Sequence, residues 1–349
     1  MVSGCRSMQV ARERQSIIPL FLRGITAVRV GVIGVGVHGL HHVRLLSRMD
    51  GVRLAGIHDI SRSVRDSVAA EFGIRAFPTL GDLLAEAECL IVAVPTSGHH
   101  EVVIECLSRG KPVLVEKPIA ASPAEAEEMI GEAEKQGVIL AVGHLERFNS
   151  AFRALSDQPL TPVFVESHRL SVFNPRGTDV AVVLDLMIHD IDILLDLVKR
   201  PVSTVHAVGV SVVSNEVDIA SARIEFTGGC VANLTASRIS QKKMRKLRLF
   251  QKNAYISMDF LAGESEIFTL KPDTRPDPLP NEPPQFMQGI SYLKTQNDGL
   301  NALALEHADF IGAVRRGSAP RVTGRDGKRA LEVAFLVMES MMASLRTME

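Results

Sequence analysis

The stretch VRVGVIGVGVHG, residues 28–39, decides the fold, because a short apolar run passes directly into the pattern G-x-G-x-x-G. The run is typical of a buried parallel strand, and a helical segment follows it. Gly34 permits a tight turn, Gly36 lets the backbone approach a pyrophosphate, and Gly39 lets helix and strand pack closely. The helix N-terminus would then offer N–H donors to an anion.

An acid follows at the spacing that a dinucleotide site requires. Asp59 ends the next predicted strand, VRLAGIHD (52–59), about 20 residues after the glycine pattern. A carboxylate there accepts hydrogen bonds from the adenosine ribose and repels a 2′-phosphate, so we predict NAD as the cofactor. Ser61 and Arg62 come next and are able to hold a phosphate, which leaves NADP open. A glycine turn that serves packing alone is the alternative.

The pattern of elements predicts two domains. Strand and helix alternate through residues 28–148, which predicts a Rossmann, doubly wound parallel sheet that binds the dinucleotide. Residues 149–349 show alternating strands, with turns such as Gly228-Gly229 and Lys252-Asn253 between them. This region predicts an antiparallel sheet with a helix on one face. It would form the substrate-binding and oligomerisation domain, with its last helices as candidates to pack back on the first domain.

Composition excludes several classes of protein. The chain has 349 residues and a net charge of −1, which argues against a general nucleic-acid binder. Its four cysteines lack zinc-ligand spacing and suggest no disulfide framework, so we expect no metal site and a cytoplasmic location. No apolar run is long enough to cross a bilayer without a charge. Residues 1–27 are basic, and we expect a disordered extension or an overlong start there.

A second stretch, LDLMIHDIDILLDL (184–197), predicts an apolar helix with a narrow acidic line. At 3.6 residues per turn, Asp185, His189, Asp192 and Asp196 share one stripe. A solvated helix face is the alternative, but it would be wider and mixed with Lys, Glu or Arg. For Asp192 and Asp196, we expect capping, salt bridging or solvent contact.

Two strand ends complete the candidate site. VPTSGHH (94–100) follows the third strand, where ribose and nicotinamide should pass, and His99 either lines that cleft or begins a helix near solvent. The fourth strand ends in Glu116-Lys117-Pro118, at the edge where ligands bind in this fold, with a cis proline bond as one option. The predicted cofactor contacts are Gly34, Gly36, Val37, His38, Gly39, Asp59, Pro95, Thr96, His99, Glu116 and Lys117.

These motifs together resemble the glucose–fructose oxidoreductase and inositol dehydrogenase (Gfo/Idh/MocA) family. The resemblance covers about residues 28–347 and includes GVIGVGVHG, IHD, VPTSGHH, GKPVLVEKPIA, VGHLERFN, LDLMIHDID and VTGRDGKRALEV. It implies a Rossmann domain followed by a domain with a large, mostly antiparallel open sheet. It also implies a homodimer or homotetramer, because open sheets in this family often pair face to face.

The resemblance places Lys117, Asp185 and His189 in an active site that oxidises a secondary alcohol. Such a reaction needs a base for the hydroxyl proton and a cation near the developing alkoxide. We assign His189 as the base and Lys117 as the orienting or proton-relaying cation, with the reverse division left open. Asp185 would reach His189 or a second hydroxyl.

Within the family, VGHLERFNSAF (142–152) and the segment 167–192 are similar to UDP-N-acetylglucosamine 3-dehydrogenases of lipid A synthesis, which make a 3-keto sugar. A nucleotide sugar needs cations for its diphosphate and amides or carboxylates for its hydroxyls. The candidates are Arg147, Asn149, Arg169, Arg176 and Asp179, each with a structural role as its alternative. A free-sugar or inositol-type dehydrogenase is the second hypothesis, and a non-catalytic NAD-binding sensor or scaffold is the third.

The basic run QKKMRKLRLF (241–250) has three interpretations. It is a charged sheet edge or turn, a contact to substrate phosphate, or a nucleic-acid patch, which the net charge disfavours. We expect neither a nucleic acid nor a membrane as partner.

Overall fold

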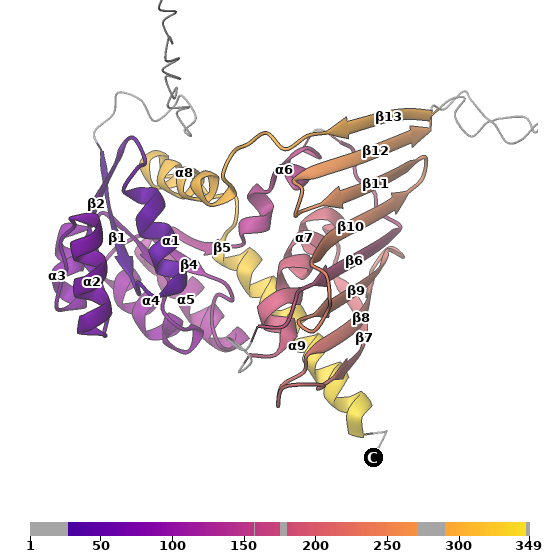
Figure 1. Cartoon of the computed structure of the whole chain (residues 1–349), viewed down its shortest axis with the longest axis horizontal. Helices are drawn as coiled ribbons and strands as arrows, with labels where there is room; N and C mark the ends of the chain where they lie inside the picture. Colours follow the sequence, from indigo (N-terminus) through magenta and orange to yellow (C-terminus); the bar gives the residue numbers. More distant parts are fainter. Residues whose placement is uncertain (1–26, 157, 175–179, 271–289, 347–349) are drawn as a thin grey trace, which may run out of the picture.

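The computed structural model describes residues 27–156, 158–174, 180–270 and 290–346. Two sheets dominate it, one wholly parallel and one mostly antiparallel, with helices around the first and against one face of the second (Figure 1). This arrangement confirms the predicted fold class. The expected extension at residues 1–27, apart from Ala27, lies outside the described residues, as do Arg176 and Asp179.

The parallel sheet has the strand order β2-β1-β3-β4-β5. Its central strands are apolar and almost fully buried, as expected for a sheet covered on both faces. The strands are β1 (Val28–Ile33), β2 (Val52–His58), β3 (Cys89–Val92), β4 (Val113–Glu116) and β5 (Leu140–Gly143).

The helices of this half begin and end at the signals that the sequence carries. Ser122 accepts a hydrogen bond from the Glu125 N–H at the start of α5, and Gly137 ends that helix in the left-handed conformation. Thr79 caps a short helix, α3, that the sequence patterns did not predict. The helices are α1 (Val37–Leu46), α2 (Arg62–Phe72), α3 (Leu80–Glu86), α4 (His99–Ser108) and α5 (Pro123–Gln136).

The second sheet has the order β13-β12-β11-β10-β6-β9-β8-β7, and β6 pairs with β9 in parallel. Gly228 and Gly229 form the turn between β8 and β9 with positive φ angles, and Asn253 turns β10 into β11. The strands are β6 (Phe164–Leu170), β7 (Val202–Val210), β8 (Ile219–Phe226), β9 (Val231–Ser237), β10 (Met244–Gln251), β11 (Ala254–Asp259), β12 (Glu264–Leu270) and β13 (Ile290–Thr295). The last two were not predicted.

Helices join the two sheets into one structure. α7 (Ile188–Val198) and the long α9 (Gly324–Arg346) pack on the inner face of the second sheet (Figure 1). α9 also begins against the parallel sheet, and α8 (Ala302–Arg316) packs on α1. In the described ranges, no helix is long and apolar enough to cross a membrane.

A π-helical turn, η4 (Val183–Met187), precedes α7. It changes the predicted stripe, because a π turn holds more residues than an α turn. Asp185 lies within this wider turn, whereas His189 lies in α7 proper. The simple 3.6-residue periodicity therefore does not describe the start of the 184–197 stretch.

Candidate active site

A cavity of about 830 Å³ lies at the carboxyl ends of β1, β2 and β3. Its walls come from the glycine-rich turn, the end of β2 and the segment that leads from β3 into α4. This is the edge at which open parallel sheets bind ligands. Of the predicted cofactor contacts, those that line the cavity are Gly34, Gly36, Val37, His38, Asp59 and Pro95.

The glycines of the turn meet different steric demands. Gly34 has φ +78°, and a Cβ on it would lie 2.7 Å from the backbone nitrogen of Val94. A Cβ on Gly39 would lie 1.9 Å from the carbonyl oxygen of Gly34, so glycine is required for the close packing of α1. At Gly36 the space is open, which leaves room for a ligand to approach the backbone.

Asp59 is fixed at the wall of this cavity. Its two carboxylate oxygens accept hydrogen bonds from the backbone N–H groups of Val35 and Ser61, both at 2.8 Å. The carboxylate is thereby tied to the glycine-rich turn. An acid held here presents negative charge where an adenosine ribose would lie.

The other predicted contacts do not line this cavity: Gly39, Thr96, His99, Glu116 and Lys117. His99 is buried, and its two ring nitrogens lie 2.9 Å from the Pro118 carbonyl and 3.0 Å from the Val94 carbonyl. Burial lowers the pKa of His99, and the contacts to the two carbonyls act in the opposite direction. This histidine begins α4 as the alternative expected, but it is buried rather than near solvent, and it joins the end of β3 to the turn after β4.

Lys117 and Asp185 are in direct contact. The Nζ atom of Lys117 donates a hydrogen bond to the backbone carbonyl of Asp185 at 2.7 Å and lies 3.4 Å from Asp185 Oδ1. The Lys117–Pro118 peptide bond is cis. The Lys117 side chain is 14% exposed and that of Asp185 is 44% exposed, so the carboxylate faces open space while the ammonium lies deeper.

Two histidines lie close to this pair and are neutral. Burial, followed by the charges of Lys117 and Arg169, lowers the pKa of His189 well below its ordinary value. Burial also lowers the pKa of His144. Within the described ranges, Nδ1 of His189 and both ring nitrogens of His144 are buried without a hydrogen-bond partner. A neutral imidazole beside an ammonium is a suitable proton acceptor.

Arg147 has other partners than a substrate. Its guanidinium makes two hydrogen bonds to the Asp192 carboxylate, at 2.7 and 2.8 Å, and a 2.8 Å ion pair with Asp196. The arginine side chain is 5% exposed. Asp192 and Asp196 therefore serve salt bridging, and the acidic line divides between Asp185 at one end and this cluster further along.

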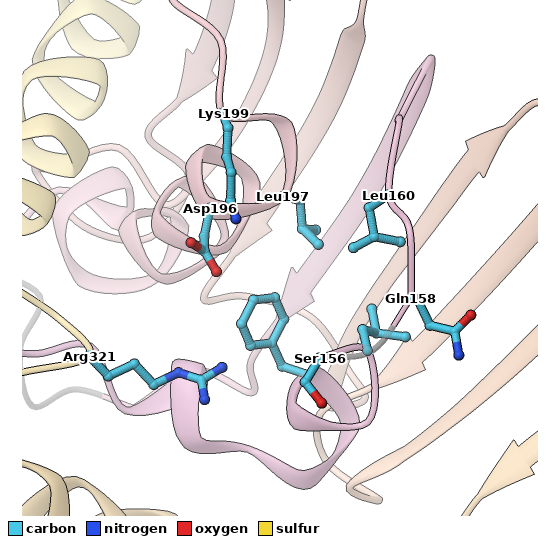
Figure 2. Close-up of a pocket in the computed structure, with 9 residues that line it drawn as sticks. Ser156, Gln158, Leu160, Asp196, Leu197, Lys199 and Arg321 are labelled. Carbon is cyan, nitrogen blue, oxygen red and sulfur yellow. The ribbon is translucent and has the colours of Figure 1, made fainter.

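Asp196 also lines a separate pocket of about 340 Å³ beyond this cluster. Figure 2 shows Asp196 and Lys199, both from the end of α7, with Arg321 reaching in from the α8–α9 connection. Lys117, Asp185 and His189 do not line this pocket. It is therefore distinct from the candidate active site.

Arg169 is also paired inside the protein. It makes hydrogen bonds of 2.8 and 3.1 Å to Asp190 and one of 3.0 Å to Glu146. Asn149 uses its side chain to cap α6 (Ser150–Arg153) and to donate to Glu146 and the Phe260 carbonyl. We therefore assign no substrate contact to Arg147, Asn149 or Arg169.

Arg245 is a cation that the sequence did not single out. It is the register partner of Arg169 on the neighbouring strand, and it contacts Glu146 at 3.4 Å. Its side chain is 46% exposed, and its charge contributes to lowering the pKa of His189. The basic run 241–250 was a signal for it, but only the strand register shows that Arg245 faces the site.

Known proteins are similar to this chain over most of its length. Residues 28–144 match a family model described as an oxidoreductase family with an NAD-binding Rossmann fold, and residues 141–257 match a GFO/IDH/MocA C-terminal domain. The chain is 34% identical over 320 residues to the UDP-N-acetylglucosamine 3-dehydrogenase of Acidithiobacillus ferrooxidans, covering 91% of this chain and 99% of that protein. A solved structure of that enzyme, with the same coverage, aligns with a TM-score of 0.84. The myo-inositol 2-dehydrogenase of Thermotoga maritima is 26% identical, over 90% of this chain and 96% of its own.

Proposed function

Because this chain belongs to the Gfo/Idh/MocA family of NAD-dependent oxidoreductases, which act on CH–OH groups, we propose that it oxidises a UDP-linked amino sugar. In its most specific form, the proposal is oxidation of the C3 hydroxyl of UDP-N-acetylglucosamine to UDP-3-keto-N-acetylglucosamine, ahead of lipid A synthesis with a diamino sugar. One observation carries it. A chain 34% identical to such an enzyme over 91% of its length brings Lys117 and Asp185 into contact, with a neutral His189 nearby.

The residues account for the chemistry as follows. Bound NAD⁺ supplies the hydride acceptor. Lys117 donates to the substrate oxygen and stabilises negative charge as the C–H bond breaks, while Asp185 orients the ammonium. His189 takes the hydroxyl proton, because the ring is neutral and its Nδ1 has no hydrogen-bond partner among the described residues. The carbonyl product, NADH and one proton balance the reaction.

Arg245 supports the nucleotide-sugar form of the proposal. Arg169 and Arg245 are cross-strand neighbours, and such like-charged pairs are unfavourable unless acids offset them. Asp190 and Glu146 hold Arg169 closely, whereas Arg245 has one longer contact to Glu146 and stays half-exposed. A guanidinium presented in this way is suited to a diphosphate.

We also infer a homodimer or homotetramer formed through the second sheet. On the face of that sheet opposite α7, a row of aromatic rings crosses five neighbouring strands, with centroids 4.7–5.7 Å apart. An apolar row of this extent is typical of an interface. The rings are Phe164, Phe250, Tyr255, Phe268 and Tyr292. Sedimentation of the native chain and of Phe268→Arg tests this, and a native monomer would contradict it.

A cytoplasmic location is part of the same proposal. Cys89, Cys106 and Cys230 are free and buried, as is usual for a protein of a reducing compartment.

The test of the proposed activity is NADH formation with a panel of UDP-sugars, free sugars and inositols. We expect turnover with UDP-N-acetylglucosamine. Turnover with inositols alone would favour a free-sugar or inositol-type dehydrogenase, the second hypothesis. The 26% identical inositol dehydrogenase is consistent with that alternative. Tight NAD⁺ binding without turnover of any substrate would favour a sensor.

Two variants test the site. Lys117→Ala and His189→Ala should each lower kcat on the order of 10²-fold, because each removes a group that acts in the transition state. Thermal unfolding provides the control for folding. Near-normal kcat in both variants would refute the assigned roles.

A further inference from the structure

A buried chain of hydrogen bonds runs from the turn after β4 to helix α8. Nε2 of His42, on α1, lies 2.9 Å from Glu116 Oε1, and Nδ1 of His42 lies 2.8 Å from Nε2 of His307, on α8. Glu116 Oε2 accepts a hydrogen bond of 3.2 Å from the backbone N–H of Lys117. His42 and His307 are buried, and neither takes part in the chemistry described above.

The protons of this chain have a consistent order. Burial, followed by the charge of His42, lowers the pKa of His307 well below its ordinary value, so that ring is neutral. A neutral His42 that donates from Nε2 to the Glu116 carboxylate accepts at Nδ1, so Nε2 of His307 donates to it. Both carboxylate oxygens of Glu116 then accept hydrogen bonds, which is the arrangement that an ionised carboxylate requires.

The surroundings favour the ionised form of Glu116 and the neutral form of the nearby Glu306. Burial raises the pKa of Glu116, but the hydrogen bond from His42 and the charges of its neighbours, including His38 and Lys117, bring it below the ordinary value. On α8, the buried carboxyl of Glu306 has no hydrogen-bond partner in the described part of the chain. Burial, then the charges of Glu116 and Asp309, raise the pKa of Glu306 well above its ordinary value, so it is neutral.

The neighbouring strand leaves room for the carboxylate. A Cβ on Gly143 of β5 would lie 3.3 Å from Glu116 Oε2, tighter than ordinary contact. The Glu116 side chain is 20% exposed, so the chain of hydrogen bonds ends at a carboxylate that is partly accessible to solvent. Glu116 directly precedes Lys117 at the end of β4, and the charges of His38 and Lys117 both act on its carboxylate.

We propose that the Glu116–His42–His307 chain presents a carboxylate to the nicotinamide end of the cofactor site and thereby favours NAD⁺ over NADH. The inference rests on the proposed position of the nicotinamide beside Lys117. The oxidised ring carries a positive charge that the reduced ring lacks, so a nearby carboxylate attracts only the oxidised form. His42 and His307 are positioning residues, because they act through Glu116. The consequence for turnover is that NADH is held less tightly than NAD⁺.

The experiment measures the ratio of two dissociation constants, Kd for NADH over Kd for NAD⁺. NADH binding is followed by its own fluorescence, and NAD⁺ binding is followed by displacement of NADH. The variants are Glu116→Gln, His42→Leu and His42→Gln, whose amide keeps an N–H donor. Glu128→Gln is the matched control, because Glu128 also contacts a histidine, His100, at 2.8 Å but does not line the dinucleotide cavity. Far-UV circular dichroism checks folding.

We expect Glu116→Gln and His42→Leu to lower the ratio about tenfold, the size of one charge interaction weakened by solvent. His42→Gln should restore most of it, and Glu128→Gln should leave it unchanged. An unchanged ratio in folded Glu116→Gln, even with weaker binding of both cofactors, would overturn the proposal and leave Glu116 a structural role. A folded His42→Leu with the native ratio would overturn the role of the chain. One folded variant of the two, Glu116→Gln or His42→Leu, is therefore enough to test the proposal. No sugar is needed, so failure of the proposed substrate would leave this test intact.

Discussion

Arg169 and Arg245 face each other across β6 and β10, and replacing each by methionine should have opposite consequences. Arg169→Met should destabilise the fold. The fraction of this variant that folds should have a nearly unchanged KM for the nucleotide sugar. Arg245→Met should raise that KM and leave stability nearly unchanged. Methionine keeps most of the apolar stem, so the comparison isolates the guanidinium.

The structure supplies the magnitudes. Arg169 is 3% exposed and makes three hydrogen bonds of 2.8–3.1 Å to Asp190 and Glu146, whose side chains are also buried. Removing one partner of a buried ion pair costs about 3–5 kcal/mol, because the other charge stays buried and unpaired. Arg245 is half-exposed with one contact at 3.4 Å, so its loss should cost under ~1 kcal/mol.

Urea unfolding and thermal unfolding measure the stability, and initial rates at varied UDP-sugar measure KM. For Arg169→Met, the expected fall in Tm is on the order of 10 °C. For Arg245→Met, the expected rise in KM is about 10-fold or more, the size of one charge-assisted contact to a diphosphate. Native stability in Arg169→Met together with a raised KM would refute this account and would indicate that Arg169 binds the substrate.

Two further predictions concern the ionisable residues Glu306 and Asp59. Glu306→Gln should stabilise the protein at neutral pH, because the raised pKa of Glu306 means that the folded state keeps a proton that the unfolded state loses above pH 4.5. The gain should vanish below that pH and grow by at most ~1.4 kcal/mol per unit as pH rises, and a gain that does not change with pH in urea unfolding would contradict this. Asp59→Ala should weaken NAD⁺ binding about 10-fold and reduce the preference for NAD⁺ over NADP⁺, because the charge that repels a 2′-phosphate is removed. Equal losses for the two cofactors in a binding titration would argue against that role.

The parallel half of the fold could be predicted because its signals are local. The apolar run before Gly34, the serine cap of α5 and the glycine stop at Gly137 each act within a few residues of themselves. The short α3 was missed because its seven residues are too few for a periodic pattern. β12 and β13 were missed next to the proline-rich segment 271–286, which lies outside the described residues.

The candidate site was harder to predict, because its charges are set by long-range pairing. A helix pattern shows that Asp192 is on an apolar face, but not that Arg147, 45 residues earlier, neutralises it. In the same way, the strand register of β6 and β10 decides that Arg245 faces inward. The contact between His42 and His307 joins residues 265 positions apart, and no local pattern contains it.

The central claim is that this chain oxidises a UDP-linked amino sugar, and one measurement tests it most directly. The purified protein is mixed with NAD⁺ and UDP-N-acetylglucosamine, NADH is followed by absorbance, and the product is examined by mass spectrometry. The account predicts NADH and a UDP-sugar that has lost two hydrogens, with both absent in Lys117→Ala. NADH formation with inositol or free sugars, and with no UDP-sugar, would contradict it.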